Sequence, residues 1–327
     1  MEQPEFNIEG ERTFTAELLE DDDSETLKGT LTDTGYRGAG DGACRASCGV
    51  AHATGQQDRT ALLSGWKRRF TRAYYGRTRP SCMRRARLRT SGGVVSGRYE
   101  DGIVTTRDAE YVVGQDGELT YPCSPSALYC VGRNFAATLD QMDYERPDEP
   151  DFFIKPPASL VGHDDPIWYP DWTNELTYAG ELVAVIEEEC HDVAAADVPD
   201  VVEGYTIMND VDALDQQGRT ARKAFDTSGP LGPWIETDID PHGIDMTTTI
   251  NGEQRQAANT ELMLFDPHEI VAYLSRRFTL RPGDAIAFGS PANPGTIEPG
   301  DRIEITYEGI GTLSNTVAAS ETDAQPS

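Results

Sequence analysis

Lysine is almost absent from this chain of 327 residues, in which Lys28, Lys67, Lys155 and Lys223 are the only four. Acidic residues number 56 against 28 basic ones, which gives a formal net charge of −28. Such a surface is typical of proteins from a salt-rich cytoplasm, where high ionic strength screens the self-repulsion. We therefore expect a halophilic protein that binds neither nucleic acid nor anionic membranes, with an acidic mesophilic protein as the alternative.

Long apolar runs and paired cysteines are missing as well. No stretch reaches the roughly 18 apolar residues that a membrane-spanning helix needs, and the acidic N-terminus has no apolar signal core. The six cysteines form no CxxC pair, so neither a disulfide framework nor a zinc signature is indicated. The five histidines have no HxxxH spacing, and GxSxG, P-loop and GxGxxG motifs are absent. We expect a protein of the reducing cytoplasm without a membrane span.

One segment differs sharply in composition from the rest of the chain. Residues 37–98 hold 14 of the 28 basic residues and only two acidic ones. This inversion predicts a stretch read in the wrong frame of a GC-rich gene, disordered or poorly packed. The alternative is a genuine basic arm that folds onto an acidic body. Before it, residues 1–36 read as an acidic arm, either mobile or a short strand pair, and residues 319–327 read as a polar tail.

Residues 99–318 carry the regular patterns. Apolar and branched residues predict strands at 102–106, 110–113, 126–131, 152–155, 181–187, 205–211 and 303–307. Helices are predicted at 135–142 and after Asp266-Pro267, where an N-cap residue precedes a proline in the first turn. Many short strands with few helices favour a β-rich α+β fold over a doubly wound one.

Two carboxylates and a lysine are the first candidates for chemistry. Glu181 and Asp210 each lie at the edge of a predicted buried strand, where a pair of oxygen ligands suits Mg²⁺ or Ca²⁺. Lys223 follows Asp210 closely, and a lysine kept in a lysine-poor chain is well suited to bind a substrate carboxylate or enolate. For Lys155, substrate binding and a structural ion pair remain equally open.

Ordered motifs resemble the fumarylacetoacetate hydrolase family over residues 99–318. They are YCVGRNF (129–135), FIKPP (153–157), GYTIMNDV (204–211), KAFDT (223–227) and GSPA (289–292). The resemblance implies the mixed β-roll or sandwich of that family's C-terminal domain, in a homodimer with Mg²⁺ or Mn²⁺. It also implies a hydrolase or isomerase that acts on a small 2-oxo or β-diketo acid, such as an acylpyruvate, through a metal-stabilised enolate. The chain is identified as a divergent, haloarchaeal-type member.

Roles for individual residues follow from the resemblance. It implies metal binding by Glu181 and Asp210, catalytic roles for Lys223 and Gln217, and substrate binding by a further three residues. These three are Arg133, Lys155 and Ser290.

Four positions depart from the family pattern. Ala179 replaces a metal-binding glutamate, which should weaken metal binding because ligand charge sets affinity. Asp212, on the same face of the predicted strand as Asp210, is a candidate for partial compensation. Leu214 replaces an arginine. Thr138 and Gln141 replace a histidine–glutamate pair that activates water, a contribution of about 10²–10⁴-fold. We therefore expect an isomerase, decarboxylase or tautomerase rather than a hydrolase, with a catalytically impaired paralogue as the alternative.

Overall fold

The computed structural model describes four N-terminal strands and then residues 83–143, 145–292 and 295–319. The chain divides into two compact units, Met1–Pro80 and Ser81–Ser327. The first unit contains β1 (Glu5–Ile8), β2 (Arg12–Asp21), β3 (Ser24–Thr32) and β4 (Ala51–Ala53), paired in that order in one antiparallel sheet. Three of these strands lie in the predicted acidic arm, and the remainder of residues 1–82 lies outside the described part.

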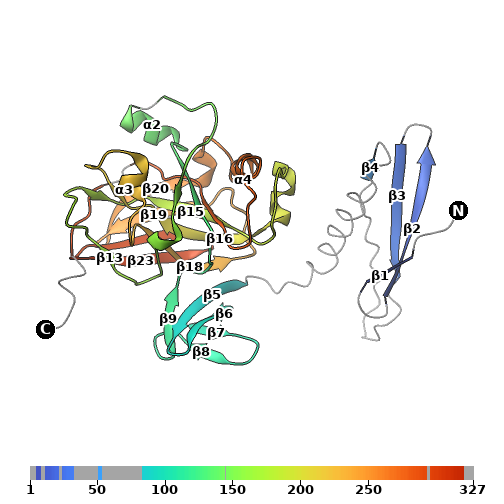
Figure 1. Ribbon diagram of the computed structural model, residues 1–327, viewed down its shortest axis with the longest axis horizontal. Helices are drawn as coiled ribbons and strands as arrows, with labels where there is room; N and C mark the ends of the chain where they lie inside the picture. The colour runs from blue at the N-terminus through green and yellow to red at the C-terminus, as the bar shows by residue number, and fades with distance from the viewer. Residues whose placement is uncertain are drawn as a thin grey trace. The chain divides into compact units, whose positions relative to one another are not determined.

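The second unit is built around a sheet of twelve strands (Figure 1). They are β5 (Arg84–Thr90), β6 (Gly93–Glu100), β7 (Ile103–Thr105), β8 (Glu110–Val112), β9 (Gly117–Thr120), β10 (Leu128–Gly132), β11 (Asp151–Lys155), β12 (Leu160–Val161), β15 (Gly180–Ile186), β16 (Val202–Asn209), β18 (Gly229–Glu236) and β21 (Ala285–Ala287). The main path runs β11-β10-β21-β15-β16-β18-β5-β6-β7-β8, while β12 pairs with β18 and β9 with β5. Antiparallel pairs predominate, with parallel pairing where β21 joins β10 and where β12 joins β18.

A five-stranded sheet and a two-stranded sheet complete the unit. The first has the order β13-β23-β22-β19-β20 and the second pairs β14 with β17; the bounds are β13 (Ile167–Trp168), β14 (Leu176–Thr177), β17 (Asp212–Ala213), β19 (Asp245–Ile250), β20 (Glu253–Asn259), β22 (Arg302–Tyr307) and β23 (Gly311–Ala318). The helices are α2 (Ala136–Met142), α3 (Arg219–Lys223) and α4 (Pro267–Ser275), with 3-10 turns η2 (Pro157–Ser159), η3 (Ala195–Asp200) and η4 (Thr260–Leu262). This strand-rich arrangement confirms the predicted β-rich α+β class.

Strand β15 lies at the centre of the core. All of its residues are buried, as its near-continuous apolar run predicts for a strand covered on both faces. Leu182, Ala184 and Ile186 join the larger hydrophobic cluster, which also takes in the inward residues of β19, β22 and β23. Val183 and Val185 join a second cluster on the opposite face. The two sheets thus pack together through one face of β15, while Glu181 lies on the opposite face with Val183 and Val185.

The N-terminal edge of this unit differs from the boundary predicted at Tyr99. The unit begins at Ser81, and β5 and β6 are ordered strands within the large sheet. In the cluster Arg84–Arg89, Ala86 and Leu88 point into a small hydrophobic core of their own, so the segment does alternate. Residues 83–98 are therefore ordered, and the rest of the segment expected to be disordered or misread lies, apart from β4, outside the described residues.

Acidic partners explain why a basic strand is stable at this edge. Arg84 pairs with Glu236 and lies over the ring of Trp234, while Arg85 pairs with Glu203. On the same strand, Arg87 donates a 2.6 Å hydrogen bond to the carbonyl of Cys123. These contacts agree with the alternative of a basic segment that folds onto an acidic body.

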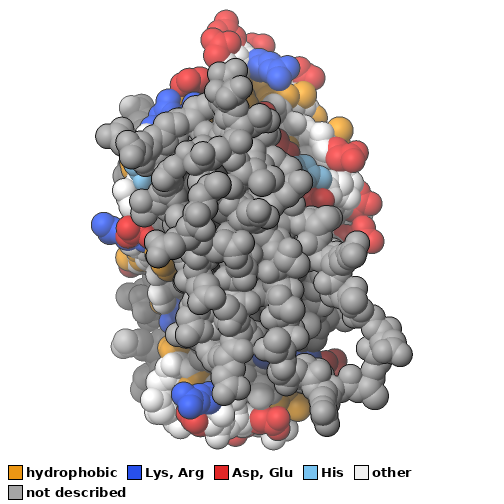
Figure 2. Space-filling view, turned by 90° about the vertical axis from the view of Figure 1, so that its right-hand side faces the viewer, with side chains coloured by type: hydrophobic (Ala, Val, Ile, Leu, Met, Phe, Trp, Pro, Cys, Tyr) orange, Lys and Arg blue, Asp and Glu red, His pale blue; other side chains and the backbone are white. Residues whose placement is uncertain are grey.

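The described helices and surface bear on the expected environment. Among these residues no helix has both the length and the apolar character that crossing a bilayer demands. On the face drawn in Figure 2, acidic side chains are spread around the margin of the described surface, with fewer basic ones between them.

Candidate functional site

Strands β15 and β16 bring the predicted carboxylates together. The two strands pair antiparallel, with Gly180 opposite Asn209 and Glu181 opposite Met208. Just beyond β16, the amide of Asp210 donates a 2.9 Å hydrogen bond to the carbonyl of Ala179. Glu181 is 3% exposed and Asp210 is 2% exposed. Two acids separated by almost thirty positions in the sequence thus share one buried region, where a charge requires a partner.

Two lysines supply partners for Asp210. Lys155 Nζ lies 3.0 Å from Oδ1, and Lys223 Nζ donates a hydrogen bond to Oδ2. Burial opposes ionisation of Asp210, but the two ammonium groups outweigh it and hold the pKa of this carboxyl below its ordinary value. Burial alone would lower the pKa of Lys223, yet the negative charges of Asp210 and Asp212 raise it. Both groups are therefore charged near neutral pH.

Lys155 is held as a structural cation. Its side chain is fully buried, and Nζ donates hydrogen bonds to the carbonyls of Val211, Lys223 and Ser228 and to the Ser228 hydroxyl. Of the two alternatives left open by the sequence, this geometry favours the structural ion pair. Lys223 is different, because 15% of its side chain is exposed and its ammonium lies 5.1 Å from the centre of the Phe153 ring. Of the two lysines, Lys223 is the one whose side chain is partly exposed.

Glu181 has fewer compensating contacts than Asp210. Its Oε2 accepts a 3.0 Å hydrogen bond from the amide of Gly289. Burial, followed by the nearby charge of Asp210, raises the pKa of Glu181 to about 8. Asp210 Oδ1 is buried and, despite its ion pair, accepts no hydrogen bond among the described residues. The two buried carboxyl groups offer oxygen ligands of the kind that a divalent cation such as Mg²⁺ prefers, and Lys155 already lies 3.0 Å from Asp210 Oδ1.

Position 179, where the family pattern has a third carboxylate, lies at the same place in the structure. Ala179 is half-buried, and its carbonyl is bound by the amide of Asp210, so position 179 lies beside the metal-binding candidates. Asp212, the suggested substitute, is bound by Arg222 through both oxygens at 2.7 and 2.5 Å and lies 3.1 Å from Lys223. Asp212 therefore already has two cationic partners, as Asp210 does.

The loop that carries Ser290 connects Glu181 to helix α2. Thr138 Oγ1 on α2 donates a 3.0 Å hydrogen bond to the Ser290 carbonyl, next to the residue whose amide binds Glu181. Gln256, only 1% exposed, donates a 3.1 Å hydrogen bond to the hydroxyl of Ser290. The position expected for the family's histidine therefore lies at the site, but a threonine occupies it.

Gln256 and Asn134 were not singled out from the sequence. Gln256 Nε2 binds the carbonyl of Pro291, and its Oε1 accepts from Thr248 at 2.9 Å. Asn134 is completely buried and binds the carbonyl of Phe288 at 2.8 Å, which fixes the start of α2. Gln256 is a polar residue in a strand that is mostly exposed, so the sequence does not indicate that its side chain is buried. The GRN motif contained Asn134, but its role depends on a contact with residues more than 130 positions away.

Arg133 and Gln217 lie further out. Arg133 lies 3.7 Å from Asp151, which Arg219 binds through both oxygens at 2.8 and 2.7 Å. Arg133 and Arg219 are therefore two partly exposed cations that flank the carboxylate of Asp151. Gln217 is exposed on the turn before α3. The buried cluster therefore unites Glu181, Asp210 and Lys223, whereas Gln217 stays at the surface.

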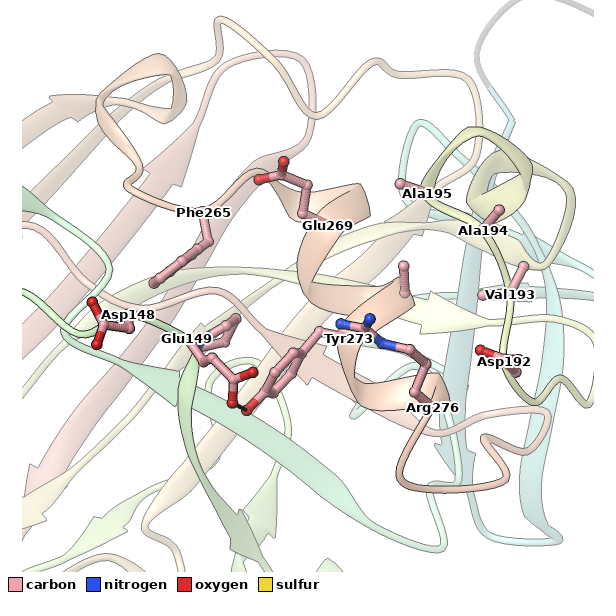
Figure 3. Close-up of a pocket in the computed structure, with 12 residues that line it drawn as sticks. Asp148, Glu149, Asp192, Val193, Ala194, Ala195, Phe265, Glu269, Tyr273 and Arg276 are labelled. Carbon is pink, nitrogen blue, oxygen red and sulfur yellow. Dashed lines mark hydrogen bonds between the residues drawn. The ribbon is translucent and has the colours of Figure 1, made fainter.

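A hollow in the described structure lies away from this cluster. It has a volume of about 600 Å³ and is formed around α4 (Figure 3). Its charged lining consists of Asp148, Glu149, Asp192, Glu269 and Arg276. Four carboxylates against one guanidinium repel an anionic substrate, and none of the predicted site residues lines it. The candidate site is thus identified by its buried charges and not by this hollow.

Residues 127–318 are similar in sequence to a known family of proteins. The family model described as fumarylacetoacetate (FAA) hydrolase C-terminal matches residues 127–318. Protein Rv2993c of Mycobacterium tuberculosis is 43% identical over 209 residues, which make up 62% of this chain and 79% of that protein.

Two solved structures extend the comparison to proteins with named activities. The 5-carboxymethyl-2-hydroxymuconate delta-isomerase from Mycobacterium smegmatis is 38% identical, with a TM-score of 0.68 over 73% of this chain and 99% of its own. Maleylpyruvate hydrolase from Sphingobium sp. SYK-6, in complex with manganese(II) ion and pyruvate, is 28% identical, with a TM-score of 0.63 over 73% of this chain and 100% of its own. Similar chains thus include one named as an isomerase and one named as a hydrolase.

Proposed function

Because this chain belongs to the fumarylacetoacetate hydrolase C-terminal family, we propose that it is an enzyme that acts on a small 2-oxo or β-diketo acid, such as an acylpyruvate or a fumarylacetoacetate-like compound. The reaction passes through the enolate of the substrate. The observation that carries this proposal is the buried cluster in which Asp210 is paired with Lys155 and Lys223 beside Glu181. Burying these charges costs free energy. Enolate chemistry gives a reason to keep them, because fixed positive charge stabilises the negative charge that develops on the substrate.

Lys223 is the residue that we place against the substrate. Its side chain is 15% exposed and its ammonium is fixed by Asp210 and Asp212, so it is oriented before substrate binds. A positive charge aimed at the developing enolate oxygen stabilises the transition state without reorganisation. The cationic pair Arg133 and Arg219 around Asp151 lies on partly exposed chain and suits recognition of a second carboxylate.

Glu181 and Asp210 would hold the Mg²⁺ or Mn²⁺ that the family implies. When bound there, the ion supplies Lewis-acid polarisation of the vicinal oxygens of a 2-oxo acid. With Ala179 in place of a third carboxylate, we propose weaker binding than a three-carboxylate shell gives.

The residues on α2 determine the class of reaction. Thr138 and Gln141 hold the positions of the water-activating pair, and neither side chain accepts a proton near neutral pH. Decarboxylation leaves the electron pair of the broken carbon–carbon bond in the enolate and needs no base to form it. Isomerisation and tautomerisation also pass through the enolate, but they need a group other than Thr138 or Gln141 that takes a proton from the substrate and returns it. These reactions need the charge stabilisation that Lys223 provides and no activated water, so we favour them over hydrolysis.

A second candidate function is a catalytically impaired paralogue that keeps the fold and binds a 2-oxo acid. The joint replacements Ala179, Leu214, Thr138 and Gln141 favour it. For either function we propose a halophilic, cytoplasmic homodimer of haloarchaeal type, on the strength of the acidic, lysine-poor composition and the family.

One set of measurements separates the two functions. The full chain is purified in molar KCl, stripped with a chelator and reloaded with Mg²⁺ or Mn²⁺, and loss of acylpyruvate and oxaloacetate is followed by ultraviolet absorbance. We expect metal-dependent turnover that Asp210→Asn abolishes. Lys223→Met should reduce it by roughly 10²–10³-fold, the size of one lost transition-state contact.

A matched control uses the exposed carboxylate of Asp226, three residues after Lys223. Asp226→Asn removes the same charge as Asp210→Asn and should keep full turnover. Absence of both bound metal and turnover, with no change on Lys223→Met, would leave the impaired paralogue as the function.

A further inference from the structure

A second group of ligand-type side chains lies outside the site described above. His242, Asp266 and His268 each offer one ligand atom, and these atoms lie within 4.8 Å of one another. Within the described part of the chain this is the one set of three such residues. We propose that it binds a divalent transition-metal ion of the Zn²⁺ type through two histidines and one carboxylate, separately from the Glu181–Asp210 site.

Asp266 is arranged with one oxygen for the fold and one for a ligand. It is the N-cap of α4, where Oδ1 accepts hydrogen bonds from the amides of His268 and Glu269 at 2.7 and 3.4 Å. Oδ2 is not used in this cap and is hydrogen-bonded to Nε2 of His242. The helix cap therefore fixes the carboxylate, because the capping contacts are part of the helix itself.

His242 has the surroundings of a metal-binding histidine. Its Nδ1 lies 2.5 Å from Oδ1 of Asp240, while its Nε2 faces Asp266. Metal-bound histidines nearly always use their second ring nitrogen in this way, since a carboxylate there orients the ring and strengthens it as a ligand. The amide of His242 also binds Asp240, at 3.1 Å, so Asp240 is held on the loop between β18 and β19 and acts as a positioning residue.

His268 completes the group from the first turn of α4. Its ring lies nearly perpendicular to that of His242, at 85°, with the centroids 5.0 Å apart. The hydroxyl of Tyr205 lies 3.4 Å from its Nε2, which restrains the ring from outside the group. Ligand atoms at about 2.0–2.2 Å from a tetrahedral Zn²⁺ are roughly 3.3 Å apart. Because the three ligand atoms already lie within 4.8 Å of one another, small side-chain rotations would bring them to this spacing.

The choice of metal follows from the ligands. Two imidazoles and one carboxylate favour Zn²⁺ and its transition-metal neighbours over Mg²⁺ or Ca²⁺, which prefer oxygen alone. The side chain of His242 is 42% exposed, so solvent can take the fourth position. The bound ion would connect the β18–β19 loop to α4, where His242 already pairs with Asp266 and packs against the ring of His268.

The test uses the full chain with both Glu181→Gln and Asp210→Asn, so that the first site cannot contribute. In molar KCl, which screens the diffuse attraction of cations to the acidic surface, Co²⁺ is titrated and its visible absorption is recorded, with Zn²⁺ as competitor. We expect one Co²⁺ per chain, displaced by Zn²⁺. His242→Gln or His268→Asn should abolish the signal, and Asp240→Asn should weaken binding by roughly 10–100-fold.

The matched control is His191→Asn, since His191 lies outside the group and contacts the carbonyl of Phe278; it should bind Co²⁺ normally. A measurement without variants uses proton NMR of the wild-type chain, in which Zn²⁺ should shift the ring signals of two of the five histidines. Absence of Co²⁺ binding, binding unchanged by both histidine replacements, or no shifted ring signals would overturn the proposal.

Discussion

Glu181 provides a quantitative test of how the candidate site is charged. Burial and the charge of Asp210 raise its pKa from an ordinary 4.5 to about 8. Between these two values the folded chain keeps a proton that the unfolded chain has lost, so the free energy of unfolding decreases as the pH rises through this window. At about 1.36 kcal/mol per pKa unit, this rise in pKa sets an upper limit of about 5 kcal/mol.

Glu181→Gln should remove this pH dependence. A glutamine oxygen can still accept the hydrogen bond from Gly289, whereas it has no proton to lose. In chelator and molar KCl, the variant should match the wild type near pH 4 and become more stable than it by several kcal/mol near pH 9, as measured by urea unfolding. Added Mg²⁺ or Mn²⁺ should stabilise the wild type and not the variant.

The control for this measurement is Glu187→Gln, which removes one exposed carboxylate directly after the same strand. If the gain in stability near pH 9 came only from lowering the net negative charge, Glu181→Gln and Glu187→Gln would gain equally. A stability difference between wild type and Glu181→Gln that stays constant from about pH 5 to pH 9 would refute the reasoning.

Three further predictions concern neighbouring positions. Ala179→Glu should restore the missing ligand and strengthen Mn²⁺ binding by at least about 10-fold, measured by calorimetry, with Ala179→Gln as the uncharged control. The pair Thr138→His and Gln141→Glu should raise hydrolysis of an acylpyruvate by roughly 10²–10⁴-fold, and no gain would show that α2 is wrongly placed for a base. Lys155→Met should destabilise the fold by roughly 3–5 kcal/mol because it leaves Asp210 less compensated, whereas a loss of turnover at unchanged stability would contradict the structural role.

The sequence predicted the elements of the second unit well where local pattern was enough. The apolar run of β15 is buried on both faces, and Asp266-Pro267 begins α4 with a complete capping box. Both features depend on residues close together in the chain, for which periodicity and capping chemistry give direct signals. The pairing of Glu181 with Asp210 was expected only from the family resemblance, because it depends on the register of β15 against β16.

Predictions failed where charge had to be judged without its partners. Arg84 and Arg85 looked out of place in an acidic chain, yet Glu236 and Glu203 lie opposite them. These acids are more than a hundred residues away in sequence, and composition alone cannot show such a match. Lys155 remained undecided for the same reason, since the carbonyls that bind it come from three separate positions after β16.

The ammonium of Lys155 also affects how related chains should be interpreted. It binds backbone carbonyls, and every residue type supplies these, so its contacts survive large changes in the surrounding side chains. A lysine at this position in another chain therefore reports that the loops after β16 are correctly folded, and it carries no information about whether that chain turns over a substrate. Under the function proposed above, the residues at positions 138, 141 and 179 would separate active from inactive members, whereas this lysine would not.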